Sequence, residues 1–553
     1  MRPLSRAFSL LGSAKSNNQR YPMIDRRTVL AAAGASIALS ALGLPLPAFA
    51  ASKLKLGKPQ PFSFDALSKE MQTRATHPYA RENSLPADVL DSIDYEALGK
   101  VKFDTDYALF RDGPGQYPVT FFHLGKFSRT PVHMYALETS GNQAVASEIV
   151  YDSGYFHMPA DSPARRLPKG AGFAGFRFQE SRTGDQQKLD WHNNDWTAFL
   201  GASYFRGIGE LYQYGLSARG VAVDVSAPGR QEEFPDFTRF YFEPPAEGSH
   251  DVTVYAALEG PSLTGAYKFV MHRDKAVGMD VEARLFLRQD IAQLGVAPMT
   301  SMYWFSETAK PTATDWRPEV HDSDGLALWN GNGEHIWRPL NDTEHPTTSS
   351  FADKSPKGFG LLQRDRVFDH YLDGVHYERR PSLWIEPLDD WGDGAVQLIE
   401  IPTDDEFHDN VVAMWVPKQP AKAGSNLRFH YRLYWSADEP HPTPLARCVA
   451  TRLGRGGEPG KPRPKGVKKF VVEFFGGPLA SLPFGTKPQP ILSAPTGTFS
   501  YVFTEAVPDS VPGHWRASFD YTAAGPGVVE MRLFLKNGDQ TLSETWSYQY
   551  TAE

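Results

Sequence analysis

The feature that most constrains the fold is the recurrence of short segments in which apolar and polar residues alternate, with turn residues between them. The clearest segment runs from Leu427 to Trp435, where every second residue is apolar, as in a strand with one buried face. Segments at 117–122 and 253–258 also have strand-like composition. The chain has 47 Gly and 44 Pro, and 13% of its residues are aromatic, which favours strands and turns over helical bundles. We therefore expect an all-β protein, with modest helices confined to residues 60–95.

The chain is expected to divide into two β-rich regions of unequal size. Residues 437–444 read Ala-Asp-Glu-Pro-His-Pro-Thr-Pro, and a proline-rich sequence of this kind is stiff and extended, as in a linker. After the linker, short alternating segments continue to the end of the chain, as in a small immunoglobulin-like sandwich. We predict a large N-terminal β-sandwich over residues 51–436 and a small immunoglobulin-like β-sandwich over residues 445–553.

Residues 1–50 have the pattern of a bacterial export signal. A pair of arginines, Arg26 and Arg27, precedes the apolar run 29–44, and the small-residue pattern Ala-Phe-Ala follows at 48–50, as at a signal cleavage site. Sixteen apolar residues are short for a membrane span. The paired arginines are typical of a twin-arginine signal. We predict a mature protein that begins near residue 51 and reaches the periplasm by the twin-arginine route.

Charge and cysteine content exclude several classes of function. Without residues 1–50 the chain has 51 Lys and Arg against 64 Asp and Glu, a formal charge of −13. Such a chain is a poor partner for nucleic acid or an anionic membrane, whereas a neutral sugar is compatible with it. The single cysteine, Cys448, excludes a disulfide framework, and we expect it to be buried and inert. The 16 histidines lack paired ligand spacing, so we expect no metal and no other cofactor.

Two acidic stretches beside aromatic residues form the candidate site. Residues 317–325 contain three acids and a histidine, and residues 402–410 follow an apolar strand, a position where active-site loops commonly occur. Aromatic rings stack on sugar rings, and two carboxylates in different environments are the minimum for glycoside hydrolysis. On composition alone, these aspartates could equally cap turns. The aromatic residues near these loops are Trp304, Trp329, Trp337, Tyr377, Trp384 and Trp391. Among the tryptophans, we predict that Trp304, Trp329 and Trp384 contact a sugar.

A series of blocks in this sequence resembles, in the same order, the periplasmic glucan biosynthesis proteins of types G and D. The blocks are 172–177, 199–206, 212–220, 233–237, 264–269, 297–302, 380–384 and 543–546. The likeness covers nearly the whole mature chain, and the twin-arginine signal is more similar to type D. The resemblance implies a large β-sandwich joined to an immunoglobulin-like domain, and a role in making glucans with β-1,2-linked glucose backbones.

The resemblance also implies which residues act. Members of the family are similar to glycoside hydrolases that cleave β-1,2-glucan internally with inversion of the anomeric centre. Their two catalytic aspartates match Asp322 and Asp409, and their nearby acidic residue matches Glu406. Positions that line the family's sugar cleft match Tyr377 and Arg380. We favour Asp409 as the acid and Asp322 as the base, by a narrow margin, and the reverse order stays open.

Three functions remain open at this point. The chain is expected to hydrolyse β-1,2-glucan, to transfer the glycosyl group to a sugar hydroxyl as a trimming or cyclising transglycosylase, or to act as a glucan-binding scaffold for the membrane glucan synthase. The expected ligand is β-1,2-glucan, and both a contact with the synthase and a homodimer are left open. His408 precedes Asp409, where an apolar residue is expected, so the efficiency of hydrolysis is in question.

Overall fold

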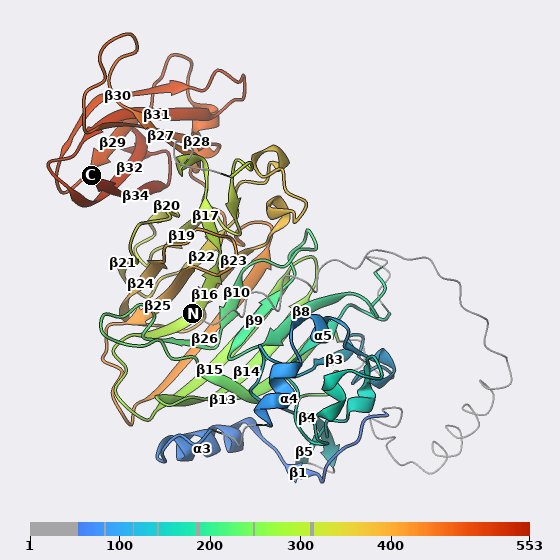
Figure 1. The fold of residues 1–553 in the computed structure, drawn as a ribbon. Helices are drawn as coiled ribbons and strands as arrows, with labels where there is room; N and C mark the ends of the chain where they lie inside the picture. The colour runs from blue at the N-terminus through green and yellow to red at the C-terminus, as the bar shows by residue number, and fades with distance from the viewer. Residues whose placement is uncertain are drawn as a thin grey trace, which may run out of the picture. The chain divides into compact units, whose positions relative to one another are not determined.

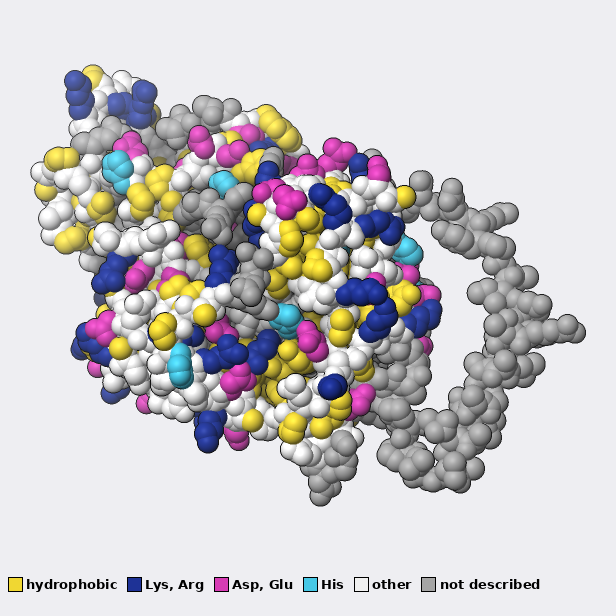
Figure 2. Space-filling view, turned by 60° about the horizontal axis from the view of Figure 1, so that its bottom comes forward, with side chains coloured by type: hydrophobic (Ala, Val, Ile, Leu, Met, Phe, Trp, Pro, Cys, Tyr) yellow, Lys and Arg dark blue, Asp and Glu magenta, His cyan; other side chains and the backbone are white. Residues whose placement is uncertain are grey.

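The structure of the protein is a computed structural model that describes residues 53–81, 85–113, 115–140, 143–183, 189–246, 249–309 and 315–552. Strands dominate it (Figure 1), which confirms the all-β expectation. The predicted export signal lies outside the described residues. Among the helices that the structure describes, none is long and apolar enough to cross a membrane. On the face drawn in Figure 2, hydrophobic side chains are interspersed with charged side chains of both signs.

The chain forms two compact units. Unit 1 comprises Met1–Ala202, Asp236–Glu259 and Thr264–His272, and unit 2 comprises Ser203–Pro235, Gly260–Leu263 and Arg273–Glu553. This division by compactness differs from the predicted limits at residues 436 and 445, because the C-terminal strands belong to the same unit as residues 273–436. The predicted domain boundary therefore stays a prediction.

Two of the three α-helices described in unit 1 lie within the predicted range 60–95, and the third, at 95–99, extends beyond it. The three helices are α3 (Phe64–Ala75), α4 (Ala87–Ser92) and α5 (Tyr95–Gly99). Helix α3 begins after Ser63, whose hydroxyl accepts a hydrogen bond from the backbone N–H of Ala66, a common way of satisfying the first free donors of a helix. Leu67 and Met71 form part of its buried face.

Unit 1 contains two facing layers of strands. One layer has the order β1 (Gln60–Pro61), β5 (Gln143–Glu148), β4 (His133–Ser140), β12 (Asp236–Phe242), β13 (Asp251–Glu259) and β14 (Leu263–Arg273). The other pairs β3 (Val119–Phe122), β7 (Gly175–Gln179) and β8 (Asp195–Leu200), and a small pair joins β2 (Lys102–Phe103) to β6 (Phe156–His157). Aromatic rings fill the space between the layers: the ring of Phe176 lies 4.8 Å from those of Phe199, Phe240 and Phe242. This dry aromatic core accounts for the sandwich form.

Unit 2 also contains two layers of strands. Its first layer has the order β15 (Val277–Leu287), β26 (Asn426–Ser436), β23 (Ser382–Pro387), β22 (Gly358–Leu362), β19 (Gly325–Trp329) and β20 (His335–Pro339). Its second layer has the order β21 (Thr347–Lys354), β24 (Asp393–Glu400), β25 (Val411–Pro417), β16 (Leu294–Ser301), β10 (Ser217–Arg219) and β9 (Tyr204–Gly207), with β11 (Val221–Val223) also paired to β16. In β26 the buried and less buried residues alternate, as the sequence pattern predicts.

The C-terminal strands form the predicted immunoglobulin-like sandwich (orange to red in Figure 1). One sheet has the order β27 (Arg447–Arg455), β28 (Val467–Phe475), β31 (His514–Thr522) and β30 (Thr498–Ala506). The other has β29 (Gln489–Ser493), β32 (Gly527–Asn537) and β34 (Thr545–Ala552), with β33 (Gln540–Thr541) beside β32. Cys448 is fully buried in the core between them, as predicted.

This small sandwich is attached to the larger one by more than a linker. Strand β34 pairs in parallel with β20, so one sheet runs from the larger sandwich into the smaller. Arg364 donates to the Glu544 carboxylate at 2.6 Å, and both side chains are buried. Within residues 437–444, Asp438 pairs with Arg447 at 2.6 Å and Glu439 pairs with Arg364 at 3.4 Å. These contacts explain why the compact unit includes both sandwiches.

Candidate active site

Asp322 is held in a buried turn at the end of β18 (Val320–His321), which pairs with β17 (Tyr303–Phe305). Its backbone N–H donates to the carbonyl of Met302 at 2.8 Å. The next residue, Ser323, is fully buried and its hydroxyl lies 2.6 Å from that of Ser301. Asp322 is only 6% exposed. The sequence predicts a turn here, and the structure adds that the turn is packed into the core.

Asp409 is held near β17 by the next residue in the chain, Asn410. The side chain of Asn410 accepts a hydrogen bond from the N–H of Tyr303 and donates one to the carbonyl of Tyr303, both at 2.8 Å. The Asn410 amide also donates to the carbonyl of Ile401 at 2.9 Å. The acidic loop 402–409 therefore starts and ends at one point beside β17. Asp409 is half-buried at the end of this loop.

The surroundings of Asp322 act on its carboxyl in opposite directions. Burial raises the pKa of Asp322, and the negative charge of Asp409 raises it further, while Arg380, His321 and Arg206 lower it. Nη1 of Arg380 lies 3.0 Å from Oδ1 of Asp322. No described residue donates a well-aligned hydrogen bond to that buried oxygen. A buried carboxylate whose charge is balanced by a neighbouring arginine, and whose pKa is shifted, is a frequent mark of a functional group.

Asp409 belongs to the same electrostatic cluster. Burial raises its pKa, and Arg219, Arg206, the Thr300 hydroxyl and Arg380 lower it. Arg206 and Arg380 thus act on both aspartates, and Asp409 itself acts on Asp322. The structure therefore brings together the two aspartates and Arg380, as the resemblance implies. Their carboxyl separation stays a prediction.

Sequence reasoning missed the two arginines that lie on neighbouring strands of unit 2. Arg206 is on β9, with its guanidinium 4.9 Å from the ring centre of Tyr214. Arg219 is on β10, where it pairs with Glu232 at 2.7 Å and lies 4.7 Å from the ring centre of Tyr204. Both arginines are buried. An arginine inside an apolar strand could have indicated these residues in the sequence. A buried guanidinium requires a carboxylate or an aromatic face nearby.

Glu406 is fixed by two donors. The hydroxyl of Tyr377 donates to its Oε2 at 2.7 Å, and Nη1 of Arg317 donates to the same oxygen at 2.6 Å. The same Arg317 nitrogen donates to Asp373 at 2.6 Å, and its Nε donates to Asp315 at 2.9 Å. Arg317 is buried and holds three loops together. Sequence reasoning placed Glu406 and Tyr377 in the site but missed this arginine.

A charged histidine stands next to Asp322. His321 Nε2 lies 3.0 Å from Glu319, and Nδ1 lies 3.0 Å from the Gln363 side-chain oxygen. Burial alone would lower the pKa of His321, but the hydrogen bond to Glu319 and the neighbouring carboxylates raise it to about 9. The imidazolium places a positive charge beside Asp322.

One cluster of side chains near this histidine has the composition of a cation site. Ligand atoms of Glu319, Asp365 and His370 lie within 4.8 Å of one another. In the structure, Glu319 is bonded to His321, and Asp365 to His370 at 2.5 Å. These carboxylates are thus already paired with histidines.

The predicted sugar-contacting tryptophans are placed differently from one another. Trp304 packs half-buried against the cluster that includes Tyr377. Trp329 stacks on His335 at 5.3 Å and packs against the core of the C-terminal sandwich. Trp384 is 1% exposed inside that core, where an added Cβ at Gly358 would lie 2.4 Å from its ring. The expectation that Trp384 stacks on a sugar is therefore corrected, because its ring has no open face.

The exposed aromatic residues near the site were not predicted. Trp316 is 69% exposed and precedes Arg317, and Phe407 is 40% exposed and follows Glu406. Both therefore lie next to residues joined by the Arg317 hydrogen bonds. Exposed rings beside a polar site are suited to stacking on a ligand.

Comparisons with known proteins identify the family to which the chain belongs. Residues 62–550 match the family described as "Periplasmic glucan biosynthesis protein, MdoG". The chain is 65% identical over 529 residues to "Glucans biosynthesis protein D 2" of Ralstonia nicotianae, covering 96% of this chain and 98% of that protein. It is 44% identical over 528 residues to "Glucans biosynthesis protein D" of Stenotrophomonas maltophilia, covering 94% and 96% of the two chains. It is 43% identical over 529 residues to the protein of that name in Xanthomonas campestris pv. campestris, with the same coverage.

Proposed function

The chain belongs to the family of periplasmic glucan biosynthesis proteins, and from this premise we propose that it is a glycoside hydrolase that cleaves β-1,2-glucan internally with inversion. The observation that carries the proposal is the pair Asp322 and Asp409, two carboxyls with raised pKa values that share Arg206 and Arg380. Two carboxyls in different surroundings are what acid and base catalysis on a glycosidic bond requires. Export by the twin-arginine route is part of the same proposal.

Burial raises the pKa of both carboxyls, and arginines lower both. We assign Asp322 as the base, with Arg380 at 3.0 Å and His321 stabilising its ionised form. Asp409 is then the acid: its proton passes to the glycosidic oxygen as the bond from that oxygen to the anomeric carbon breaks. A water attacks the anomeric carbon from the opposite face and gives up its proton to Asp322. We predict a carboxyl separation of roughly 6.5–9.5 Å, because the water must fit between base and sugar, or somewhat more if waters relay the proton.

The neighbouring residues have supporting roles in this proposal. Glu406, held by Tyr377 and Arg317, orients the water or a sugar hydroxyl rather than exchanging the reacting proton. Trp316 and Phe407 offer exposed rings on which sugar residues can stack.

The decisive experiment is incubation of the purified full chain with linear β-1,2-glucan. Release of reducing ends, with NMR detection of the inverted anomer, supports the proposal. Intact polymer at high protein concentration favours the scaffold function, and cyclic or lengthened products favour the transglycosylase. Asp322→Asn and Asp409→Asn should abolish release. Asp404→Asn, at an exposed position of the same loop, is the matched control and should retain it.

A further inference from the structure

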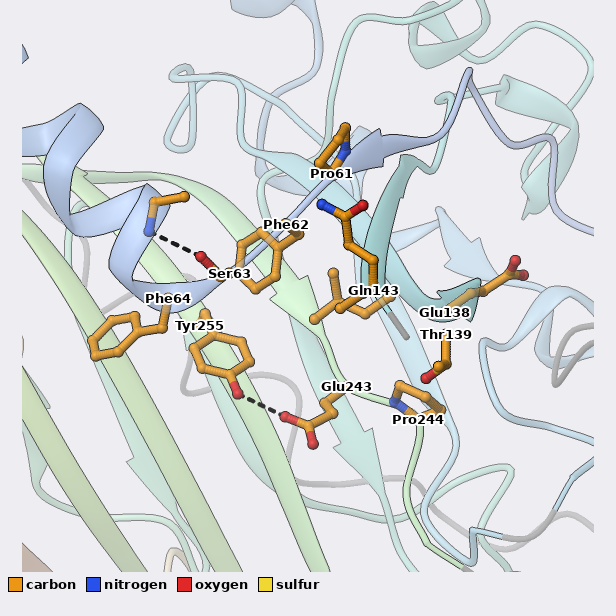
Figure 3. Close-up of a pocket in the computed structure, with 13 residues that line it drawn as sticks. Pro61, Phe62, Ser63, Phe64, Glu138, Thr139, Gln143, Glu243, Pro244 and Tyr255 are labelled. Atoms are coloured by element: carbon orange, nitrogen blue, oxygen red, sulfur yellow. Dashed lines mark hydrogen bonds between the residues drawn. The ribbon is translucent and has the colours of Figure 1, made fainter. Parts of the chain in front are cut away.

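Unit 1 contains a groove of its own, built without any residue of the candidate active site. Its volume is about 650 Å3, within the roughly 300–1,000 Å3 typical of ligand sites. The segment 61–66 at the start of α3 forms one wall, the β4–β5 hairpin forms the other, and residues of β13 and the end of β12 complete it (Figure 3). The hollow is therefore shaped by four segments that are distant in the sequence.

One wall of the groove is a prearranged set of aromatic rings. Tyr135, Tyr241 and Tyr255 lie side by side on β4, β12 and β13, because their positions are paired in register. Phe62 lies across this row, 4.5 Å from the ring of Tyr241 and 5.3 Å from that of Tyr255. Phe64 adds a ring 5.5 Å from Tyr255. Of these rings, Phe62, Phe64 and Tyr255 line the groove.

The groove also has polar groups, of which one pair is joined by a hydrogen bond. The hydroxyl of Tyr255 donates to Oε2 of Glu243 at 2.7 Å, and Figure 3 shows this bond at one end of the hollow. The opposite wall carries Glu138, Thr139 and Gln143. Glu243, Thr139 and Gln143 offer carboxylate, hydroxyl and amide partners to a ligand that lies on the rings, whereas in Figure 3 the Glu138 carboxylate points away from them.

The charge of the lining limits the class of ligand. The described residues that line the groove include two carboxylates, Glu138 and Glu243, and no Lys, Arg or His. Phosphate-bearing and other anionic ligands are disfavoured there by repulsion. Aromatic faces combined with carboxylate and amide groups suit a pyranose, whose ring faces are apolar and whose hydroxyls are hydrogen-bond donors.

We propose that this groove binds a neutral polysaccharide segment, and that its ligand is the glucan held at a second, non-catalytic site. The identity of the glucan rests on the proposed function, whereas the class of ligand rests on the groove alone. A second site on the same chain raises the apparent affinity for a long polymer, since one molecule can occupy both sites when its length permits.

The test reads the groove directly, without turnover. In the full chain carrying Asp409→Asn, Gln60→Cys introduces an exposed thiol for a trifluoromethyl tag next to the groove residue Pro61, while the native Cys448 is buried. A linear β-1,2-gluco-oligosaccharide should shift the fluorine NMR signal saturably. Thr139→Trp, which fills the groove, should abolish the shift, and Glu243→Gln should weaken binding about threefold to tenfold. Asp251→Asn, on the surface of β13 outside the groove, is the control and should bind as the parent does.

The outcomes separate this inference from the proposed function. A missing shift, or a shift that Thr139→Trp leaves unchanged, overturns the groove as a sugar site. Displacement of the oligosaccharide by millimolar tetramethylammonium would identify a cation site instead and also overturn it. Because the Asp409→Asn protein is used, a chain that proves unable to hydrolyse glucan refutes the proposed function without affecting this measurement.

Discussion

Replacing Arg317 by lysine tests whether the hydrogen bonds from Arg317 to three loops position the candidate catalytic groups. The guanidinium of Arg317 donates to Asp315, Asp373 and Glu406 at distances between 2.6 and 3.0 Å. A lysine keeps the charge, but its single ammonium cannot reproduce this planar, three-way geometry. Each charge-assisted hydrogen bond contributes about 1.5–3 kcal/mol. If the hydrogen bond to Glu406 is lost and the transition state is destabilised by this free energy, kcat/KM should fall about tenfold to hundredfold.

The assay is reducing-end release from linear β-1,2-glucan, with kcat and KM measured separately. Asp373→Asn should act in the same direction, because it removes the negative charge and one of the two acceptor oxygens with which Asp373 binds Arg317 and the backbone N–H of Val375. Arg379→Lys is the matched control, since this arginine is half exposed and its nearest acid is 3.4 Å away. Thermal melting of the variants separates misfolding from mispositioning. If Arg317→Lys and Asp373→Asn both stay within about twofold of the parent, these hydrogen bonds do not position the site and the reasoning is wrong.

Three further predictions concern other parts of the chain. Asp322→Asn and Asp409→Asn should each lower turnover at least about 100-fold; parent-like turnover in both would mean that these aspartates only cap turns. Burial raises the pKa of Glu307 to about 7, so its proton is held more tightly in the folded state. The protonated Glu307 contributes its full stabilisation at a pH below the pKa of the unfolded state, near 4.5. The stabilisation is lost as the pH rises through the raised pKa of the folded state. The melting temperature of Glu307→Gln should therefore decrease less than that of the parent protein when the pH rises from 5 to 8. Equal decreases in melting temperature would contradict this prediction. Arg26→Lys with Arg27→Lys should leave precursor in the cytoplasm, whereas normal periplasmic accumulation would rule out the twin-arginine route.

Much of the fold could be predicted from local pattern. The alternation in β26 predicts which of its residues share a buried face, and the structure confirms it. The same reasoning could not place Trp384, because periodicity says that a side chain points to one face of a strand but not what covers that face. Because Trp384 lies near acidic loops in the sequence, we expected its ring to stack on a sugar. The tertiary fold instead buries it against the C-terminal sandwich.

The candidate site was predictable only in part. Asp322, Asp409, Glu406, Tyr377 and Arg380 follow from resemblance to a family. Their contacts do not follow from it, because they join segments that are far apart in the chain. Arg317 and Glu406 are 89 residues apart in sequence, and no local pattern links them.

The sequence by itself determined the class of secondary structure and the family, because alternation and long blocks of likeness are local properties of the chain. Only the tertiary structure decided what surrounds each functional group. Asn410 reaches Tyr303 across 107 residues of sequence, and this contact sets Asp409 beside the strand that also positions Asp322. In a β-sandwich such meetings depend on the register of strands and the stacking of layers, which arise from long-range packing. That packing also sets the buried Arg206, which acts on both aspartates, and the buried Arg219, which acts on Asp409.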